Sequence, residues 1–382
     1  MNYKEFKESL VYKNYNNFKI FLRYIEYIIK GAFVNFIIKF NFIFFKTKPV
    51  IDLGSFKDNR YINFFIYALK DDFIFIYKKD ENTKKLFLRI GFLNFFKYTC
   101  SNTKFKNQKK INFLYDKEKY DSNAIFLNIN YFKYFHNKSK IRKEQMIMPY
   151  YMYPRIYNSF YKKIYPKKKP NFNLRIFFSG SIFNEVYNNF HWEKEPEKYP
   201  NRIKVINNII KEFKNEIFFI NSKNDIKSEA IFKKKIVLCL HDKMIKKTSY
   251  ILDFKNNFYF YKNSCFHLSC PGAVMPLCHH LIEGMKAGSI PITNCDELML
   301  PNLDLNMSLP YSNLDQLNDQ IKKALDMKKE EIIYMRENVF DYYEQYLSPK
   351  SFKIKFIQSL NQRNKEIICC DDHQSVKKMF NN

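Results

Sequence analysis

The side chains best suited to chemistry lie in one stretch, residues 266–293 (FHLSCPGAVMPLCHHLIEGMKAGSIPIT). Three of the chain's seven glycines fall here, next to serine, cysteine, histidine and glutamate. A turn at Pro271 and Gly272 before a helix leaves free backbone N–H groups and the positive end of a helix dipole, which suits phosphate. Glu283, about two turns into that helix, can accept hydrogen bonds from vicinal hydroxyls. A lone glutamate is more simply a surface carboxylate, but the glycine and proline punctuation favours a ligand site.

The elements that position these side chains form a strand, loop, helix, strand unit. Apolar runs predict strands over 265–270 and 289–293, and apolar residues at helical spacing predict a helix over 277–287 that ends at Gly288. Such a unit is typical of a parallel α/β sheet, whose ligands bind at the carboxyl ends of the strands. The residues expected beside that edge are Ser269, Pro271, Gly272, His279, His280 and Glu283.

The same stretch resembles the donor-binding segment of GT-B glycosyltransferases, especially the exostosin-like group. There a Pro/Gly turn precedes a helix with Arg/His-Leu-x-Glu-Ala/Gly, and Gly-x-Ile-Pro-Val/Ile follows. Here the pattern reads His280-Leu-Ile-Glu283-Gly and then Gly288-Ser-Ile-Pro-Ile292. The resemblance implies that Glu283 binds the ribose hydroxyls of a nucleotide sugar and is partly exposed in the cleft. It also implies that His279 and His280 are catalytic residues facing the donor diphosphate or sugar.

Two departures from the family pattern bear on the mechanism. His280 stands where exostosin-like proteins often have arginine. Met275 occupies the first glutamate position of the Glu-x7-Glu pattern of retaining GT-B enzymes. The missing carboxylate argues against a retaining mechanism without establishing an inverting one.

Upstream, alternating strand and helix patterns predict a first parallel α/β domain. The loop Asp58-Asn-Arg60-Tyr61 resembles a loop in the N-terminal domain of exostosin-like and related transferases. By that resemblance Asp58 is a general base and Arg60 contacts an anion on the acceptor side. An aspartate that caps the following helix is the simpler alternative. Strands are expected over 49–53, 73–77, 111–115 and 124–129, and helices over 61–69 and 86–98.

Repeated proline pairs between residues 147 and 173 predict an extended connector, after which a second domain begins. Its first strand, 175–181, ends in Ser179, Gly180 and Ser181, which are expected to approach the donor phosphates. Arg202 is the expected diphosphate clamp, because a guanidinium matches phosphate oxygens in bidentate fashion; an exposed arginine is the alternative. The other expected elements are strands 217–220 and 236–240, helices 201–213, 250–254, 314–325, 329–347 and 351–360, and a loose tail over 365–382.

These patterns predict an α/β chain with two Rossmann-like domains facing a cleft, the GT-B arrangement. The expected divisions are a basic amphipathic N-terminal helical segment (1–48), an acceptor-side domain (49–153), a linker (154–173), a nucleotide-sugar-binding domain (174–347), and a C-terminal helix and tail (348–382).

Charge and composition suggest the partners and the location. A net charge of +27 favours polyanions such as nucleotides, phosphorylated acceptors or anionic lipid. Residues 18–45 have the pattern of a basic amphipathic helix, which fits an anionic membrane face and a contact with the first domain equally well. Without a signal-peptide pattern, we expect a cytoplasmic protein, peripheral at the inner membrane face under the first hypothesis. The eight cysteines lack a metal-site spacing, so we expect reduced thiols, no metal and no cofactor.

The function that these observations favour is a glycosyltransferase that moves a sugar from a nucleotide-sugar donor to a hydroxyl on a glycan or glycolipid acceptor. Family habit suggests bacterial surface polysaccharide or lipopolysaccharide synthesis. The alternative is a non-catalytic basic protein that binds nucleic acid or another polyanion. The sequence has no nucleic-acid motif and its basic residues are spread along the chain, so we expect no specific nucleic-acid partner.

Overall fold

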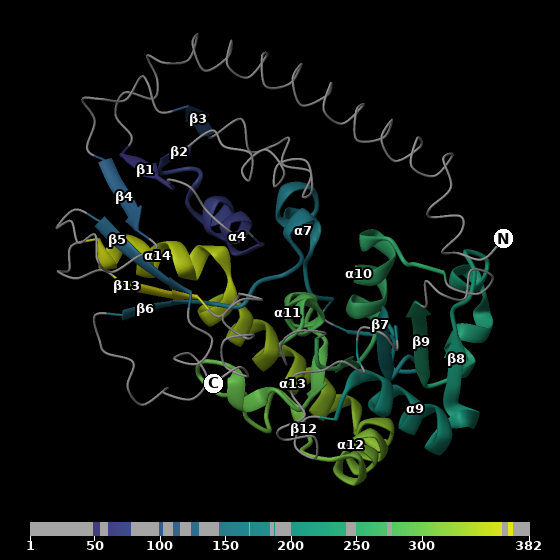
Figure 1. The fold of residues 1–382 in the computed structure, drawn as a ribbon. Helices are drawn as coiled ribbons and strands as arrows, with labels where there is room; N and C mark the ends of the chain where they lie inside the picture. Colours follow the sequence, from purple (N-terminus) through teal and green to yellow (C-terminus); the bar gives the residue numbers. More distant parts are fainter. Residues whose placement is uncertain are drawn as a thin grey trace.

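The structure is a computed structural model. It describes residues 49–53, 60–77, 99–101, 110–114, 124–129, 145–167, 169–183, 187, 200–241, 250–272, 277–360 and 366–369. In this part of the chain, two parallel sheets covered by helices form two α/β domains (Figure 1). The predicted fold class, α/β with two Rossmann-like domains, is therefore confirmed.

The first sheet has the strand order β3-β2-β1-β4-β5-β13-β6, and every pair in it is parallel. Without β13 this is the 3-2-1-4-5-6 order of the doubly wound fold, whose ligands bind where the order reverses, between β1 and β4. Its strands are β1 (Val50–Asp52), β2 (Ile74–Tyr77), β3 (Thr99–Ser101), β4 (Lys110–Leu114), β5 (Ala124–Ile129), β6 (Gln145–Met148) and β13 (Glu366–Cys369).

The strand β13 comes from the far end of the chain. Ile367 lies opposite Leu127 of β5 on one side and opposite Met146 of β6 on the other. Ile367 and Ile368 are buried, and burial of apolar surface stabilises the strand in the sheet. The loose tail predicted over 365–382 is therefore wrong for residues 366–369.

The C-terminal helix packs on the first domain through aromatic side chains. Phe352 and Phe356 lie against Phe65, with ring centroids 5.9 and 5.5 Å apart. Lys353 forms an ion pair with Asp72, with 2.6 Å between Nζ and Oδ2. Figure 1 shows this helix, α14, beside α4. The helices associated with the first domain are α4 (Arg60–Leu69), α7 (Pro154–Ser159) and α14 (Pro349–Ser359).

The second sheet is also parallel throughout, in the order β12-β11-β10-β7-β9-β8. The strand order reverses between β7 and β10, so the carboxyl ends of these two strands form the switch point of the second domain. Its strands are β7 (Ile176–Ser181), β8 (Ile217–Phe219), β9 (Ile236–His241), β10 (Phe266–Ser269), β11 (Ile290–Thr293) and β12 (Leu309–Pro310).

The helices of the second domain begin and end largely where the apolar spacing and the caps predict. The Asn201 side chain accepts from Lys204 N (2.9 Å) at the start of α9, and Gly288 follows α11 with φ +79°. The helices are α9 (Arg202–Glu212), α10 (Phe254–Asn263), α11 (His279–Lys286), α12 (Leu314–Asp326), α13 (Lys329–Tyr342) and the π-helical turn η8 (Tyr343–Leu347). Short 3₁₀ turns are η3 (Tyr161–Lys163), η4 (Lys214–Glu216), η5 (Asp225–Lys227), η6 (Glu229–Lys233) and η7 (Asp296–Leu298).

Two predicted elements differ from the structure. The connector is not extended throughout, because Pro154 starts α7, at a helix position where the missing N–H of proline costs nothing. The helix predicted over 250–254 is wrong, because the Asp253 side chain caps α10 through Asn256 N (2.8 Å) and the helix runs on to Asn263. The predicted segments 1–48 and 86–98 lie outside the described residues.

Among the residues that the structure describes, no helix is long and apolar enough to cross a membrane.

Candidate functional site

The carboxyl end of β7 brings two basic side chains to one place. A Cβ atom added at Gly180 would lie 3.2 Å from Cε1 of His280 and 3.3 Å from Nη1 of Arg202. Both side chains therefore lie close to this backbone, and an added Cβ would clash first with the Phe178 ring, 2.7 Å away. Gly180 therefore lies beside Arg202 and His280 at the switch point; its predicted approach to donor phosphates stays a prediction.

Arg202 is almost fully buried, with 3% of its surface exposed. Its Nη1 donates to the backbone oxygen of Ser181 (3.1 Å), and its Nη2 donates to Sγ of Cys278 (3.3 Å). The guanidinium carbon lies 4.7 Å from the ring centroid of Tyr187. The alternative of an exposed arginine is thus wrong. These bonds engage two of the five N–H groups, so Arg202 can offer a ligand its charge and its remaining N–H groups.

Cys278 and His280 form a charged pair beside Arg202. Burial raises the pKa of the Cys278 thiol, but the charges of His280 and Arg202 outweigh burial and bring this pKa down to about 5. Burial lowers the pKa of His280, but its charge interaction and hydrogen bond with Cys278 outweigh burial and raise that pKa. Both shifts favour the charged pair, a thiolate and an imidazolium, at the N-terminus of α11.

The resemblance implies that Glu283 is partly exposed in the cleft. This expectation is wrong, because only 4% of the surface of Glu283 is accessible. Its Oε1 accepts a hydrogen bond from the backbone N–H of Tyr153 (3.1 Å), in the segment that leaves the first domain. Burial raises the pKa of this carboxyl, and the charge of His280 opposes the rise. Glu283 therefore also connects the two domains.

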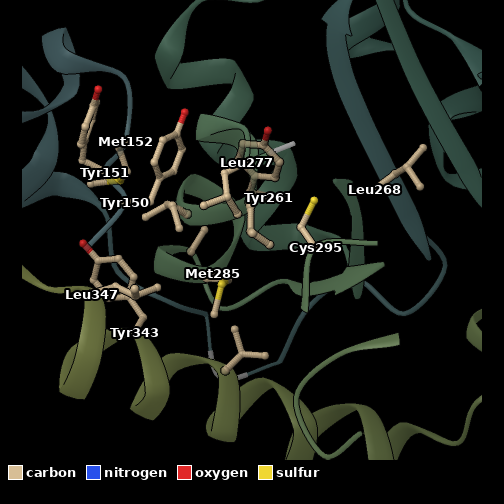
Figure 2. Packing of buried hydrophobic residues seen from close by; sticks show 14 of the residues in the cluster. Tyr150, Tyr151, Met152, Tyr261, Leu268, Leu277, Met285, Cys295, Tyr343 and Leu347 are labelled. Carbon is tan, nitrogen blue, oxygen red and sulfur yellow. The ribbon is translucent and has the colours of Figure 1, made fainter. Parts of the chain in front are cut away.

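His279 packs against the same segment of the first domain. Its Nδ1 donates to the backbone oxygen of Tyr151 (2.8 Å), and its ring stacks on Tyr150 with centroids 5.5 Å apart. Figure 2 shows Tyr150 and Tyr151 beside Leu277, just before α11. The two neighbouring histidines thus make different contacts, His280 with the Phe178 ring of β7 and His279 with the interdomain segment.

Two close contacts seat α11. A Cβ atom added at Gly284 would lie 2.4–2.5 Å from the ring of His267 on β10, so this glycine lets the helix approach the sheet. Lys286 forms an ion pair with Glu344 (2.7 Å) and lies 5.0 Å from the ring centroids of both Tyr161 and Tyr343. These contacts fix the position of every functional side chain on α11.

The sequence interpretation missed His241, at the end of β9. Its Nε2 lies 3.4 Å from Oγ of Ser179, and burial, with the charges of His280 and Arg202, lowers its pKa to about 4. It also left Cys278 without a role. His241 could have been found from the sequence, because it stands at the end of a predicted strand, where ligands bind. Cys278 could not, because its contact with Arg202 depends on tertiary structure.

The remaining predicted residues divide into three groups. Ser269 is buried at the carboxyl end of β10, and Pro271 and Gly272 follow it at the same edge of the sheet. Arg60 begins α4, just after the switch point of the first sheet, but its side chain is not described. Asp58 lies outside the described residues. Within the described part of the chain, no cluster of three or more histidine, cysteine, aspartate or glutamate side chains could hold a metal ion.

No protein-family model matches the chain, and no curated protein matches it significantly. The solved structures with a similar chain path include the N-terminal domain of Candida albicans trehalose-6-phosphate phosphatase (7% identity, TM-score 0.42, covering 82% of this chain and 96% of that one). They also include HepE of Anabaena in complex with UDP and glucose (9% identity, TM-score 0.38, covering 82% of this chain and 99% of that one). A third is a DNA-modifying β-glucosyltransferase (11% identity, TM-score 0.39, covering 82% of this chain and 100% of that one).

The class that this architecture defines is the GT-B fold. Two parallel α/β domains follow each other along the chain, and the last helix packs back on the first domain. Basic groups and a carboxylate meet at the switch point of the second sheet, beside the segment that joins the domains.

Proposed function

We propose that the protein is a glycosyltransferase that uses a nucleotide-sugar donor. The observation that carries this proposal is the meeting of Arg202, His280 and Glu283 at the carboxyl edge of the second sheet. Positive charge suits the diphosphate that leaves during sugar transfer, and a carboxylate suits the vicinal hydroxyls of a ribose.

The donor diphosphate would lie at the N-terminus of α11 and the carboxyl end of β7. The Nδ1 atom of His280 and the Nε atom of Arg202 are buried and have no hydrogen-bond partner among the described residues. Buried polar groups normally have partners, so a ligand oxygen is a natural one for each. Ser179, Ser181, Ser269, Pro271 and Gly272 would complete this part of the donor site.

The ribose would bind to the carboxylate of Glu283. One of its oxygens, Oε1, accepts from Tyr153 N, so the ribose hydroxyls would bind mainly to the other. The bond from Tyr153 holds the carboxylate in one orientation, which lowers the entropy lost when a nucleotide binds. Nucleotide binding is thereby linked to the contact between the domains.

The acceptor side of the proposal rests on the sequence. Its resemblance to exostosin-like transferases supports Asp58 as general base and Arg60 as an anion contact, with His279 and His280 on the donor side. The net charge of +27 supports a phosphorylated glycan or glycolipid acceptor, in bacterial surface polysaccharide or lipopolysaccharide synthesis. Residues 18–45 would hold this otherwise cytoplasmic enzyme at the inner membrane face. No metal or cofactor is required in the proposed site.

Calorimetric titration with UDP, GDP, ADP and CDP tests the donor site. We expect one of the four to bind saturably. Glu283→Gln should lower the affinity for that nucleotide by about ten- to a hundredfold, because charge-assisted hydrogen bonds contribute about 1.5–3 kcal/mol each. The 2′-deoxy form should bind the wild type poorly and lose little more in Glu283→Gln.

Glu331→Gln is the matched control. Glu331 is exposed on α13, outside the proposed donor site and its supports, so this change should leave nucleotide affinity unaltered. Wild-type affinity in Glu283→Gln, with a normal melting temperature, would remove the ribose assignment. If none of the four nucleotides binds, the donor-site proposal as a whole fails.

A further inference from the structure

Cys278 has surroundings that differ from those of the other described cysteines. Cys239, Cys265, Cys270 and Cys295 are buried, whereas Cys278 is only partly buried. Burial raises the pKa of each of the four buried thiols. Cys265 also interacts with two cations, Arg175 and Arg336, but burial outweighs them. Cys278 is the one of these five whose thiol pKa lies below its ordinary value, because Arg202 and His280 outweigh burial there.

The geometry around its sulfur favours a thiolate. Nη2 of the buried Arg202 donates to Sγ at 3.3 Å, and the charge of His280, two residues along, also stabilises the thiolate. Cys278 is the N-cap residue of the eight-residue helix α11, and its side chain makes no capping bond to that helix. Nε of Arg202 and Nδ1 of His280 have no partners among the described residues, so both cations can donate hydrogen bonds to an anionic oxygen at this place.

We propose that Cys278 is a modification site, a thiolate that peroxides oxidise to a sulfenic acid. Thiolates, not thiols, are the nucleophiles, and oxidation is selective for accessible thiolates beside cations. The sulfur attacks one oxygen of hydrogen peroxide, so that an S–O bond forms and the O–O bond breaks. Sulfur gives two electrons to the peroxide, and the hydroxide that leaves takes the proton of the His280 imidazolium to form water. The new oxygen lies where Arg202 and His280 can bind it.

The charges that face this sulfur come from several elements. His280 and Glu283 lie on α11, and Arg202 lies on α9. Cys270, after β10, and Tyr261, on α10, also interact electrostatically with Cys278, and so does Tyr187. The thiols and phenols are uncharged at neutral pH because burial raises their pKa values, which leaves the two cations and Glu283 as the charges that matter.

Alkylation of the native full-length chain with iodoacetamide, resolved by cysteine with mass spectrometry, tests the thiolate. A thiol of ordinary pKa should react about 75-fold faster at pH 8 than at pH 6, in proportion to its thiolate fraction. Cys278 should change less than twofold over this range, and in urea it should recover the ordinary rise. His280→Gln should restore much of the pH dependence in the folded protein. A rise of about 75-fold at Cys278 in the native chain would overturn the proposal.

Oxidation is tested with hydrogen peroxide followed by dimedone, a 1,3-dione that traps sulfenic acids. The label is expected on Cys278 in the wild type and in the control Cys295→Ser, and it should be absent from Cys278→Ala. Because the wild type itself reports the labelled position, the test does not depend on the folding of Cys278→Ala. A label confined to other cysteines, or no label, refutes the proposal.

The link to nucleotide binding rests on the proposed function. A diphosphate at Arg202 and His280 would compete with the thiolate for the same charges, so the nucleotide that binds should slow alkylation of Cys278 by tenfold or more. A reactive Cys278 that no nucleotide protects would leave the modification site intact and count against the donor site. An unreactive Cys278 in a protein that binds nucleotide would refute the modification site and leave the donor site intact.

Discussion

Gly284 offers the sharpest test of how α11 is seated. Gly284→Ala would place a Cβ atom 2.4–2.5 Å from three atoms of the His267 ring. That ring is fully buried and packs edge-on to Tyr261, with centroids 5.6 Å apart, so it has little room to move. Overpacking against so confined a ring should cost about 2–3 kcal/mol, the upper part of the usual range, while alanine gains about 1 kcal/mol of helix propensity over glycine. We expect a net loss of about 1–2 kcal/mol in the free energy of unfolding.

A double-mutant cycle separates the two terms. In a His267→Ala background the clash is absent, so Gly284→Ala should now stabilise the protein by about 1 kcal/mol. The coupling between the two positions should therefore be about 2–3 kcal/mol, measured by urea unfolding followed by circular dichroism. Nucleotide affinity should fall with Gly284→Ala alone, since a shift of α11 moves His280 and Glu283.

An equal effect of Gly284→Ala in both backgrounds would refute the reasoning, because it would show that the helix does not rest on the His267 ring. A stabilised single mutant would refute it as well. A wild-type m-value in all four proteins is the control that the cycle compares folded states rather than altered unfolded ones.

Three further outcomes follow from the structure. Burial lowers the pKa of His267 to about 3, so between about pH 6.5 and pH 3 the unfolded chain binds a proton that the folded chain does not. As the pH falls through this window, the free energy of unfolding should fall by up to about 1.4 kcal/mol per pH unit. His267→Phe should remove this part of the pH dependence. Lys286→Met should lower the free energy of unfolding, measured in urea, by about 1–3 kcal/mol, because it removes the ion pair with Glu344 and the cation–aromatic contacts. Glu344→Gln should lower it less, because Lys286 keeps its contacts with the aromatic rings. Asn201→Ala should cost about 1 kcal/mol by removing the cap of α9, whereas no change would show that this cap is dispensable.

Local sequence signals were sufficient for most strands and helices. The runs that became β7, β10 and β11 are short, apolar and bounded by glycine, proline or serine, and so their ends are marked in the sequence. Asn201 marked the start of α9 and Gly288 the end of α11 for the same kind of reason. These features depend on neighbours within a few residues, which a sequence pattern can represent.

The errors concern contacts between distant segments. Glu283 is buried and accepts a hydrogen bond from Tyr153, 130 residues earlier, and no pattern around Glu283 contains that information. Arg202 turns inward for a similar reason, since Ser181 and Cys278 provide its partners. The helix after Pro154 was missed because proline was taken as a breaker, although it is compatible with the first turn of a helix.

The position of β13 has a consequence for synthesis on the ribosome. Residues 366–369 lie between β5 and β6, so the first sheet cannot be complete until almost the whole chain has been translated. The second sheet, whose strands run from residue 176 to residue 310, can form before that. The domain nearer the N-terminus should then be the later of the two to finish folding, and until β13 arrives β5 and β6 present unpaired edges that are open to aggregation or to a chaperone.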